Sequence, residues 1–481
     1  MALTYGMRAF RKIQIGKEAT RGTAVPATAK LIGTLGMKET PTIVRPEEDR
    51  GSLSKNYRST LSSVLAEMAF EGDATFEQIL YFLLMGVTNG IGIHPESAQY
   101  YESTGPVWTS YLTEVTDDNL ATHMPADGMT ATVDYIYIGL ANPFHLIRVT
   151  MGTAKNAIAS VLSAEYSKGA SVFGALTIND DTKVAGVTLA KSGDITFSPP
   201  SDWAVDTVNG IADKYWVRLK VSVTLSATVD VAEIDLIKGV AGVQQGATAA
   251  YLWTFSPNYT ESNHQAGFTI EFGDNVDCWE AEFSLVKQLE LSGAMREVVK
   301  LSADMFGRQL TETTFTGAIT DPTELESIVA KPKFYLDDTG AGIGGTEKSA
   351  HLIDFTWRLP TGLVPIFAAT GELCFATVSE QKRAAELEMT YAFSSDGIKT
   401  EYAKVRAQTK RFIRLSFEGT LIEGAYNKKL VLDGCFQYDD WDKLGEKDGM
   451  DIVAVKLVSV YDPDWTKEFE VAVTNKVVTL P

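Results

Sequence analysis

The sequence predicts a mainly β protein with two related β domains, each accompanied by a short α-helix, and an inserted β-sandwich. The first observation is that many segments alternate apolar and polar residues, as half-buried strands do. The second is that Ser62–Gly86 and Ala385–Phe417 follow the same order of strand, turn and helix. The third is that a long stretch with its own strand and turn signals interrupts only the first copy.

The first copy begins the repeat. We expect a strand at Val64–Phe70, a tight turn at Glu71–Asp73 and then a helix. Thr75, followed three residues later by Gln78, is typical of a capping box at a helix start. The residues that fill this helix are mostly apolar and predict burial in a core: Phe76, Ile79, Leu80, Leu83 and Leu84.

The second copy has the same plan. A strand at 386–393 leads through a turn at Ser394–Gly397, where Asp396 is placed to cap the next helix. That helix carries apolar side chains at i, i+4 and i+7, which predicts one buried face: Ile398, Tyr402 and Val405. A strand follows directly, because Ile413, Leu415 and Phe417 alternate with polar residues.

The first copy is interrupted after its helix. Its next strand is expected at Tyr251–Phe255, as the counterpart of the strand that follows the second helix. Turn residues at Asn179–Asp181 and Pro199–Asp202 punctuate the stretch between them. Its strand-like segments are Tyr135–Ile138, Leu146–Val149 and Trp216–Leu225. We therefore predict a β-sandwich inserted at 113–247, which costs little stability because loop-closure entropy grows slowly with length.

Later segments of the two copies also correspond in order and pattern. The counterparts are Cys278–Leu289 with Lys429–Tyr438, Val298–Phe306 with Asp451–Val460, and Leu31–Gly33 with Leu352–Phe355. The predicted first β domain therefore comprises 1–112 and 248–325, and the predicted second β domain comprises 326–481.

The chain is acidic, with a formal net charge of −19 and an isoelectric point near 4.8. Such a surface repels polyanions, which argues against a groove that grips phosphates but suits a wall past which DNA slides. The sparse cysteines, Cys278, Cys374 and Cys435, predict a reducing compartment without disulfides. No stretch resembles a secretory signal or approaches the ~20 apolar residues of a membrane helix, so we expect a soluble protein made in a cytoplasm.

The glycine-rich segment Gly340–Gly345 superficially resembles a loop that cradles phosphate groups. It follows a strand at Lys333–Leu336, but Ser349–Trp357 is typical of another strand. A phosphate site of that type needs a helix N-terminus after the loop. We therefore interpret the segment as a flexible hairpin loop.

Residue types that bind metals or catalyse reactions form no recognisable arrangement. The histidines are scattered along the chain: His94, His123, His145, His264 and His351. Cys278 and Cys374 lie in apolar strands, which favours a place in the core, and no Gly-x-Ser-x-Gly elbow occurs. Asp439–Asp442 could bind Ca²⁺ but lacks the spacing of an EF-hand, which favours a solvated acidic turn. No catalytic, cofactor-binding or metal-binding residue is predicted, and nothing indicates an enzyme.

Several short motifs resemble those of the major tail tube proteins of long-tailed, non-contractile (siphovirus-type) bacteriophages. These motifs are Ile15–Ala27, Pro46–Gly51, Gly72–Leu80, Glu280–Phe283 and Leu289–Gly293. The resemblance covers both predicted β domains. The insert resembles β-sandwich modules that decorate the outside of phage structural proteins.

The resemblance implies a virion protein whose β domains form six-fold rings that stack into a hollow tail. Three chains with two such domains each would complete one ring, whereas one domain per chain would require six. The implied partners are further copies, the tape measure protein, other tail proteins, and DNA that passes without specific binding or membrane insertion. An acidic lumen would act only as a non-stick coating, because salt screens charges beyond about 8 Å.

Three segments are candidate contacts between rings, or else mobile surface segments. They are the arm Met1–Phe10 and the loops Arg45–Arg50 and Ala341–Lys348. Individual lumen residues are not predicted, because one sequence does not determine strand register.

Two other functions remain open. In the first, the insert binds host glycans through Trp203, Tyr215 and Trp216, whose rings could stack on sugars or instead lie in the sandwich core. In the second, the chain is a hydrolase carried in a virion, which the missing nucleophile arrangement disfavours.

Overall fold

The computed structural model describes residues 5–18, 21–54, 56–88, 90–117, 119–197, 199–200, 202–239, 243–245, 249–259, 263–369, 371–393, 398–442, 445–477 and 480. Within these residues the protein is mainly β and its named strands pair in antiparallel fashion, which confirms the predicted class. The chain divides into two compact units. The main unit comprises Met1–Asn89 and Val240–Pro481, and the inserted unit comprises Gly90–Gly239.

The main unit contains two α-helices and most of the strands. Its first part consists of η1 (Arg8–Phe10), β1 (Lys12–Lys17), β2 (Ala29–Leu31), β3 (Thr34–Val44), β4 (Thr60–Asp73) and α1 (Ile79–Gly86). After the inserted unit follow β18 (Val243–Gln244), β19 (Tyr251–Phe255), β20 (Phe268–Gly273), β21 (Cys278–Ala294), β22 (Lys300–Gly307) and β23 (Leu310–Thr313). The remainder consists of β24 (Lys333–Asp337), η2 (Gly340–Gly342), η3 (Ser349–His351), β25 (Leu352–Pro360), β26 (Leu363–Ile366), β27 (Thr377–Glu380), β28 (Glu386–Ala392), α2 (Ile398–Ala407), β29 (Arg411–Glu423), β30 (Tyr426–Trp441), β31 (Gly445–Lys447), β32 (Met450–Ser459) and β33 (Phe469–Asn475).

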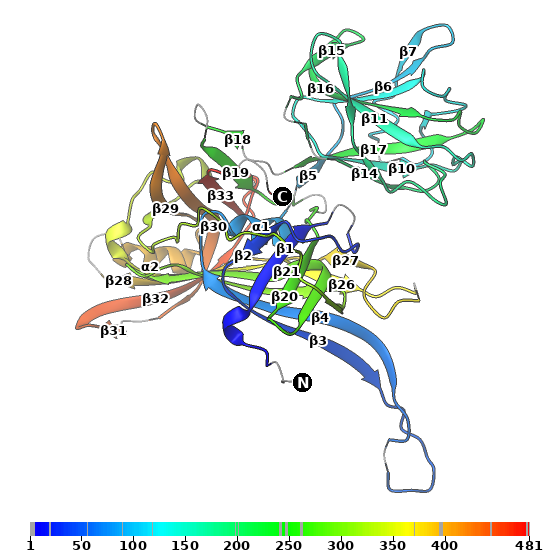
Figure 1. Cartoon of the computed structure of the whole chain (residues 1–481). Helices are drawn as coiled ribbons and strands as arrows, with labels where there is room; N and C mark the ends of the chain where they lie inside the picture. Colours follow the sequence, from blue (N-terminus) through cyan, green and yellow to red (C-terminus); the bar gives the residue numbers. More distant parts are fainter. Residues whose placement is uncertain are drawn as a thin grey trace. The chain divides into compact units, whose positions relative to one another are not determined.

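One path of paired strands runs through the main unit in the order β3-β4-β22-β21-β25-β28-β32-β30 (Figure 1). We call this path the long sheet. It consists of a first set, β3-β4-β22-β21, and a second set, β25-β28-β32-β30. In both sets the helix follows the second strand of the path, and the order of the strands along the chain is the same. The pairing of β21 with β25 joins the two sets.

The strands that flank the long sheet repeat as well. The first half of β21 pairs with β20 and β23, as the first half of β30 pairs with β29 and β33. In turn, β20 pairs with β1, as β29 pairs with β24. The same pattern of strand pairing therefore occurs twice in the main unit.

A shared irregularity fixes how the two sets correspond residue by residue. The pairing of β21 with β22 shifts register between Val286 and Gln288. The pairing of β30 with β32 shifts in the same way between Tyr438 and Asp440. Because a bulge changes which residues face each other, its presence at both places aligns Gln288 with Asp440.

This repeat corrects part of the sequence interpretation. The counterpart of β29 is β20, so the prediction that Tyr251–Phe255 takes this place is wrong. Tyr251–Phe255 forms β19, which pairs with β33 of the other half of the chain. The counterpart of β25 is β3, which begins just after Leu31–Gly33. The expected correspondences of β21 with β30 and of β22 with β32 agree with the pairings.

The start of the first repeat differs in detail from the prediction. The expected turn at Glu71–Asp73 is part of β4, because these residues still pair with β22. The hydroxyl of Thr75 accepts a hydrogen bond from the backbone N–H of Gln78 at 3.0 Å, but this bond closes the turn before α1, whose N-cap residue is Gln78 and has no side-chain cap. The Gln78 side chain does not reciprocate, and its Oε1 accepts a hydrogen bond from the N–H of Ile32. Asp396, the expected cap of the second helix, lies outside the described residues.

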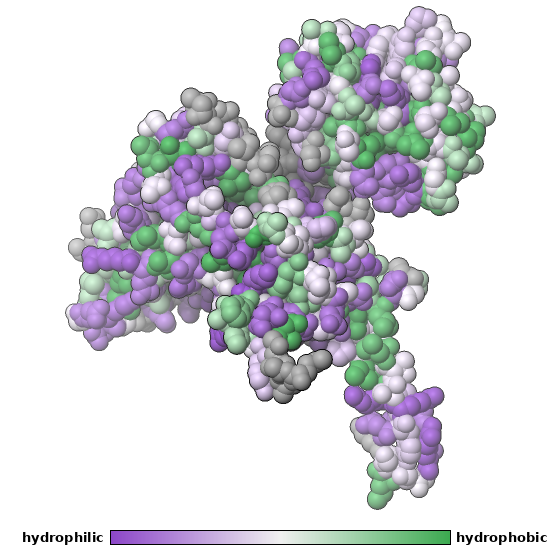
Figure 2. Space-filling model, viewed as in Figure 1, coloured by the Kyte–Doolittle hydropathy of each residue, from purple (hydrophilic) through white to green (hydrophobic). Residues whose placement is uncertain are grey.

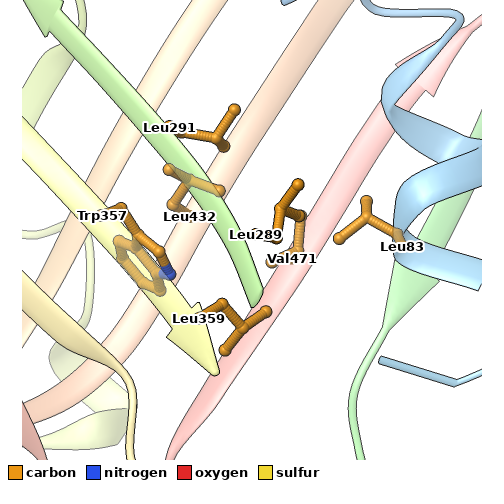
Figure 3. Close-up of a pocket in the computed structure, with 7 residues that line it drawn as sticks. All are labelled: Leu83, Leu289, Leu291, Trp357, Leu359, Leu432 and Val471. Carbon is orange, nitrogen blue, oxygen red and sulfur yellow. The ribbon is translucent and has the colours of Figure 1, made fainter. Parts of the chain in front are cut away.

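Apolar side chains on one face of the long sheet form one core with α1 and the flanking strands. All the residues of α1 are buried, as predicted for Ile79, Leu80, Leu83 and Leu84. A small apolar cavity lies in this core (Figure 3). Its lining comes from both sets, from α1 and from β33: Leu83, Leu289, Leu291, Trp357, Leu359, Leu432 and Val471.

The inserted unit contains two sheets around a separate core. One sheet has the order β13-β14-β10-β17-β5, with β8 beside β17, and the other has the order β12-β11-β16-β9-β6-β7, with β15 beside β16. The bounds are β5 (Gly90–Ile93), β6 (Ser97–Glu102), β7 (Val107–Ser110), β8 (Met124–Pro125), β9 (Tyr135–Leu140), β10 (Leu146–Met151), β11 (Leu162–Ser167), β12 (Phe173–Leu176), β13 (Asn179–Asp180), β14 (Gly193–Thr196), β15 (Asp206–Val208), β16 (Ile211–Val221) and β17 (Asp230–Gly239).

The bounds of the inserted unit differ from the predicted 113–247. Residues 90–112, which the sequence assigned to the first β domain, include β5, β6 and β7 of this unit. The turn predicted at Asn179–Asp181 coincides with the short strand β13 (Asn179–Asp180). The turn predicted at Pro199–Asp202 includes Ser201, which lies outside the described residues. The two expected β domains, in turn, form one compact unit, because β21 pairs with β25 and β19 with β33.

Candidate assembly surface

The long sheet has a polar face opposite its core. Side chains alternate between the two faces of a strand, so residues that pair across strands share a face. One row on the polar face runs across the sheet through Glu71, Ser302, Glu290, Arg358, Glu386, Val458 and Gln437. The next row runs through Asp73, Lys300, Ser292, Thr356, Glu388, Lys456 and Asp440. Polar residues therefore cover this face in both sets.

Ion pairs occupy the basic residues of the polar face. Arg358 pairs with Glu290 at 2.8 Å and with Glu388 at 2.7 Å. The hydrogen bond to Glu290 raises the pKa of Arg358, so this guanidinium keeps its charge. Further pairs on this face are Lys38 with Glu67, Lys300 with Asp73, Lys456 with Glu386, and Lys447 with Asp354.

Carboxylates exceed these cations on the polar face. Glu71, Asp304 and Asp440 share the face with the ion pairs and are exposed. The basic residues of the two rows are paired with carboxylates, and Lys287, which acts on Glu67 from the bulge of β21, is a further cation near this face. Glu71, Asp304 and Asp440 outnumber it, so the local potential is negative. A polyanion close to this face would be repelled over roughly one Debye length, about 8 Å at physiological salt.

The two sets meet at an internal joint formed by β21 and β25. Gln288–Ala294 pairs with Asp354–Pro360 along the full length of this contact. The Thr361 hydroxyl, just beyond β25, donates to the carbonyl of Val286 at 2.8 Å. At this joint the polar face is bridged by Arg358 and Glu290, and the buried face contributes Leu289, Trp357 and Leu359 to the core.

Both ends of the long sheet are open edges within the described residues. β3 pairs with β4 on one side, and neither the strand pairings nor the other backbone hydrogen bonds give it a second partner strand. The last residues of β30, from Gln437 to Trp441, pair with β32 on one side only. An unpaired strand edge presents free N–H and C=O groups, which makes it a template for pairing with another chain.

The predicted ring-contact segments lie at separate places on the main unit. Arg45–Arg50 lies in the tip of the hairpin formed by β3 and β4, which projects beyond the neighbouring strands (Figure 1). Figure 2 shows apolar residues among hydrophilic ones on this hairpin, and Ile43, Val44 and Leu61 are at least 40% exposed. Glu48 binds both Arg50 and Arg58.

The other two segments are anchored in different ways. In the arm Met1–Phe10, residues 1–4 lie outside the described residues, and the side chain of Asn275 binds the backbone of Tyr5 and Met7. Ala341–Lys348 connects β24 to β25. No contact in the described part of the chain brings these three segments together.

The glycine-rich loop binds a carboxylate of its own chain. Asp337 accepts hydrogen bonds from the backbone N–H groups of Gly344, Gly345 and Thr346. A bound phosphate would need such groups, so this loop has the donors of an anion site already engaged. The segment after it contains η3 and β25 and no α-helix, in agreement with the hairpin interpretation.

The remaining sequence candidates do not assemble into a metal or catalytic site. No group of three or more His, Cys, Asp or Glu side chains in the described residues has a geometry that could hold a metal ion. Cys278, Cys374 and Cys435 are buried, and burial raises the pKa of the Cys278 and Cys435 thiols to about 12. Asp439 and Asp440 belong to β30, so the interpretation of Asp439–Asp442 as a turn is wrong.

The two tryptophans of the glycan hypothesis are buried, and Tyr215 is half-buried against the sandwich core. Trp216 is fully buried, and its Nε1 donates to the carbonyl of Asp206 at 3.1 Å. Trp203 is 8% exposed and contacts Tyr215 edge to face. Trp216 belongs, with Tyr137 and Val208, to a mainly aromatic cluster on the face of its sheet that points away from the sandwich core. Its half-buried members are Tyr101, Trp108, Tyr135, Phe173 and Ile211.

The polar face and the internal joint were missed at the sequence level. The alternation of Glu386, Glu388 and Thr390 with apolar residues in β28 did indicate a polar face. The joint depends on pairing between Glu290 and Arg358, which no local pattern specifies. Among the described residues, no helix is both long and apolar enough to cross a membrane. Comparison of the sequence with known protein families finds no match, and a search of curated proteins finds none either.

Proposed function

We propose that this chain is the major tail tube protein of a long-tailed, non-contractile bacteriophage. In this proposal, copies close into rings, rings stack into a hollow tube, and genomic DNA passes along an acidic lumen. The observation that carries the proposal is the long sheet, which is built twice on one pattern, is polar on one face and is open at both edges. A sheet with these properties loses its open edges when further copies extend it into a closed barrel.

The polar face is the proposed lumen wall. Ion pairs such as Arg358 with Glu290 occupy its cations, and exposed carboxylates such as Glu71 and Asp304 remain. DNA would find no basic groove to bind and would be kept from contact at short range. The mechanism is therefore physical, since a tube wall must guide the polymer without holding it.

The repeat favours three chains per ring, because each chain supplies two equivalent sets of strands. Six chains per ring would be expected if only one set faced the lumen. The proposed partners are further copies of the chain, a tape measure protein and other tail proteins. Under this proposal the protein acts in the virion after synthesis in the host cytoplasm.

Negative-stain electron microscopy of the purified protein tests the proposal. We expect rings or hollow rods, with three copies per ring by mass measurement. A protein that stays monomeric at high concentration would contradict the proposal.

The inserted unit, proposed as a β-sandwich that decorates the assembly, is dispensable for the tube. Gly90 and Gly239 pair with each other at the ends of β5 and β17, so a short linker can replace residues 90–239. This deletion should leave ring formation intact. Loss of rings in a folded deletion variant would show that the unit takes part in the wall.

A second candidate function is glycan binding by the inserted unit. The aromatic cluster on the outer face of its second sheet favours it, since Arg218 lies 4.5 Å from the ring of Tyr135 and 4.2 Å from that of Phe173. Aromatic rings beside hydrogen-bonding groups are suited to sugars. Binding of the full chain to a glycan array, lost in Trp108→Ala, would support this function, and no binding would remove it.

A further inference from the structure

Two strands that correspond in the repeat, β25 and β3, differ in how much of their surface is exposed. β25 is the edge strand of the second set, and each of its residues is buried or half-buried because β21 lies beside it. β3 occupies the same place in the first set, yet every residue from Lys38 to Val44 is exposed. At Lys38 and Glu39 the difference arises because β25 has a neighbour on both sides and β3 on one, whereas Thr40–Val44 lie in the part of the hairpin that projects beyond β22.

The two helices show the same contrast. Every residue of α1 is buried, and the chain just after β25 covers its end. A Cβ on Gly86 would lie only 2.9 Å from Cγ2 of Thr361. In α2, Tyr402 was predicted to be buried but is 37% exposed, and it contacts Trp441 at the end of β30. The apolar side of α2 therefore lies beside the open edge of β30.

The repeat specifies the register in which such an edge would be filled. After the shared bulge, Gln288 corresponds to Asp440, so two residues later Glu290 corresponds to Asp442. Met37 of β3 faces Met68 of β4, and Trp357 of β25 faces Leu387 of β28. Met37 therefore corresponds to Trp357, and Lys38 to Arg358. These correspondences use only hydrogen-bonded pairings inside the chain.

The charges at the corresponding positions match. Arg358 binds Glu388 of its own set and Glu290 of the other set across the joint. Lys38 likewise binds Glu67 of its own set, at 2.8 Å. Asp442, at the position of Glu290, is exposed and forms no ion pair in the described part of the chain. Lys38 and Asp442 at the two open edges thus have the same charges as Arg358 and Glu290 at the internal joint.

We propose that β3 of one copy pairs antiparallel with Asp440–Asp442 of a second copy, at the end of β30 and just beyond it, in the register of the internal joint between β21 and β25. Lys38 of one copy then faces Asp442 of the next, as Arg358 faces Glu290. This pairing rests on the proposed ring and names the contact that closes it. It covers the exposed backbone of β3 and places Tyr402 beside the incoming strand.

Paired cysteines test the register. Cα atoms of residues that face each other across antiparallel strands lie about 4.5–5.5 Å apart, which suits a disulfide. We expect Lys38→Cys combined with Asp442→Cys to form disulfide-linked oligomers on mild oxidation. Lys38→Cys combined with Lys447→Cys is the matched control, since Lys447 lies on the same open edge but outside this register. The native cysteines are buried, so they should not compete.

Electron microscopy of the same samples separates this inference from the proposed function. Hollow rods with crosslinking of 38 to 442 support both. Rods without that crosslink, or with equal crosslinking of 38 to 447, overturn the register and leave the tube function standing. Crosslinking without rings or rods supports the pairing and overturns the tube, and absence of both overturns both.

Charge reversal provides a second measurement that needs no disulfide. Lys38→Glu alone and Asp442→Lys alone place like charges at the contact, which is destabilising across strands. Each should raise the concentration required for assembly severalfold, and the double variant should restore it. Both side chains are exposed, so the circular dichroism of the unassembled chain should not change. Double and single variants that assemble equally poorly would overturn the proposal.

Discussion

Lys428 of β30 forms an ion pair with Glu77, which lies in the short turn into α1, and so links the two halves of the repeat. The Lys428 side chain is only 6% exposed, and Glu326 lies 3.5 Å from its Nζ. Burial is the largest single influence and opposes the charged form. The hydrogen bond to Glu77, together with the negative charges of Glu77, Glu326 and Glu324, outweighs it and raises the pKa of Lys428. One buried cation therefore balances several carboxylates between the halves.

Lys428→Met should destabilise the main unit by about 3 kcal/mol, because it leaves buried carboxylates without their cation. Urea denaturation followed by circular dichroism measures the change. Combining it with Glu77→Gln removes one of those charges while an amide oxygen still accepts the N–H of Glu326. The double variant should recover part of the loss, and no recovery would contradict this electrostatic account.

Glu18 predicts a pH dependence of stability. Its carboxylate accepts hydrogen bonds from the N–H groups of Phe283 and Gly22, but burial dominates and raises its pKa. A carboxyl group whose pKa is higher in the folded state binds its proton more tightly there. Its contribution to stability is therefore fully present below the unfolded-state pKa and is lost as the pH rises through the folded-state pKa.

Glu18→Gln should be less stable than the native chain at every pH, because the amide nitrogen cannot accept one of these bonds. The gap should widen as the pH is lowered from 7 to 4, since only the native chain gains from protonation. Thermal or urea unfolding of both proteins across this range measures the gap. A constant gap would show that Glu18 does not titrate between the two states in this window.

The cavity in the main core predicts a stabilising substitution. Val471→Ile adds one methylene beside Leu83 and Leu289 in a space that is lined by apolar groups. We expect a gain of up to about 1 kcal/mol, the transfer free energy of one methylene. Val473→Ile, on the same strand and equally buried but away from the cavity lining, is the control and should be destabilising. Equal effects of the two substitutions on urea midpoints would argue against a usable space.

The separate cores of the two units predict separate unfolding transitions. Trp216 is fully buried in the inserted unit, and Trp357 is 2% exposed in the main unit. Trp216→Ala should cost the inserted unit about 3–5 kcal/mol and leave the main transition in place. Trp357→Ala should do the reverse. Scanning calorimetry of both variants measures this, and a single transition that shifts equally in both would show that the units unfold together.

The sequence predicted those parts of the fold that are encoded locally. Alternation identified the mainly β class, which the structure confirms. The spacing from Thr75 to Gln78 marked the turn that leads into α1, although the helix itself begins only at Ile79. The Tyr251–Phe255 prediction failed because its partner, β33, is more than two hundred residues away in the chain. Tyr402 was expected in the core because helical periodicity identifies an apolar face without showing what covers it.

The candidate surface was harder to predict than the class. The polar face becomes visible only when strands from both halves are placed in register, as in the contact of Arg358 with Glu290. A shift of one residue would exchange the two faces of a strand. Composition did predict an excess of acid, but it could not assign that acid to one side of one sheet.

Only the first set carries the inserted unit, because α1 leads into Gly90 whereas α2 leads directly into β29. A closed ring of three copies would therefore bear this appendage at alternate positions around the wall. Its outline would repeat every 120° while the backbone of the bore repeats nearly every 60°. Averaged end-on images should then show a three-fold harmonic from this unit in addition to the nearly six-fold pattern of the bore.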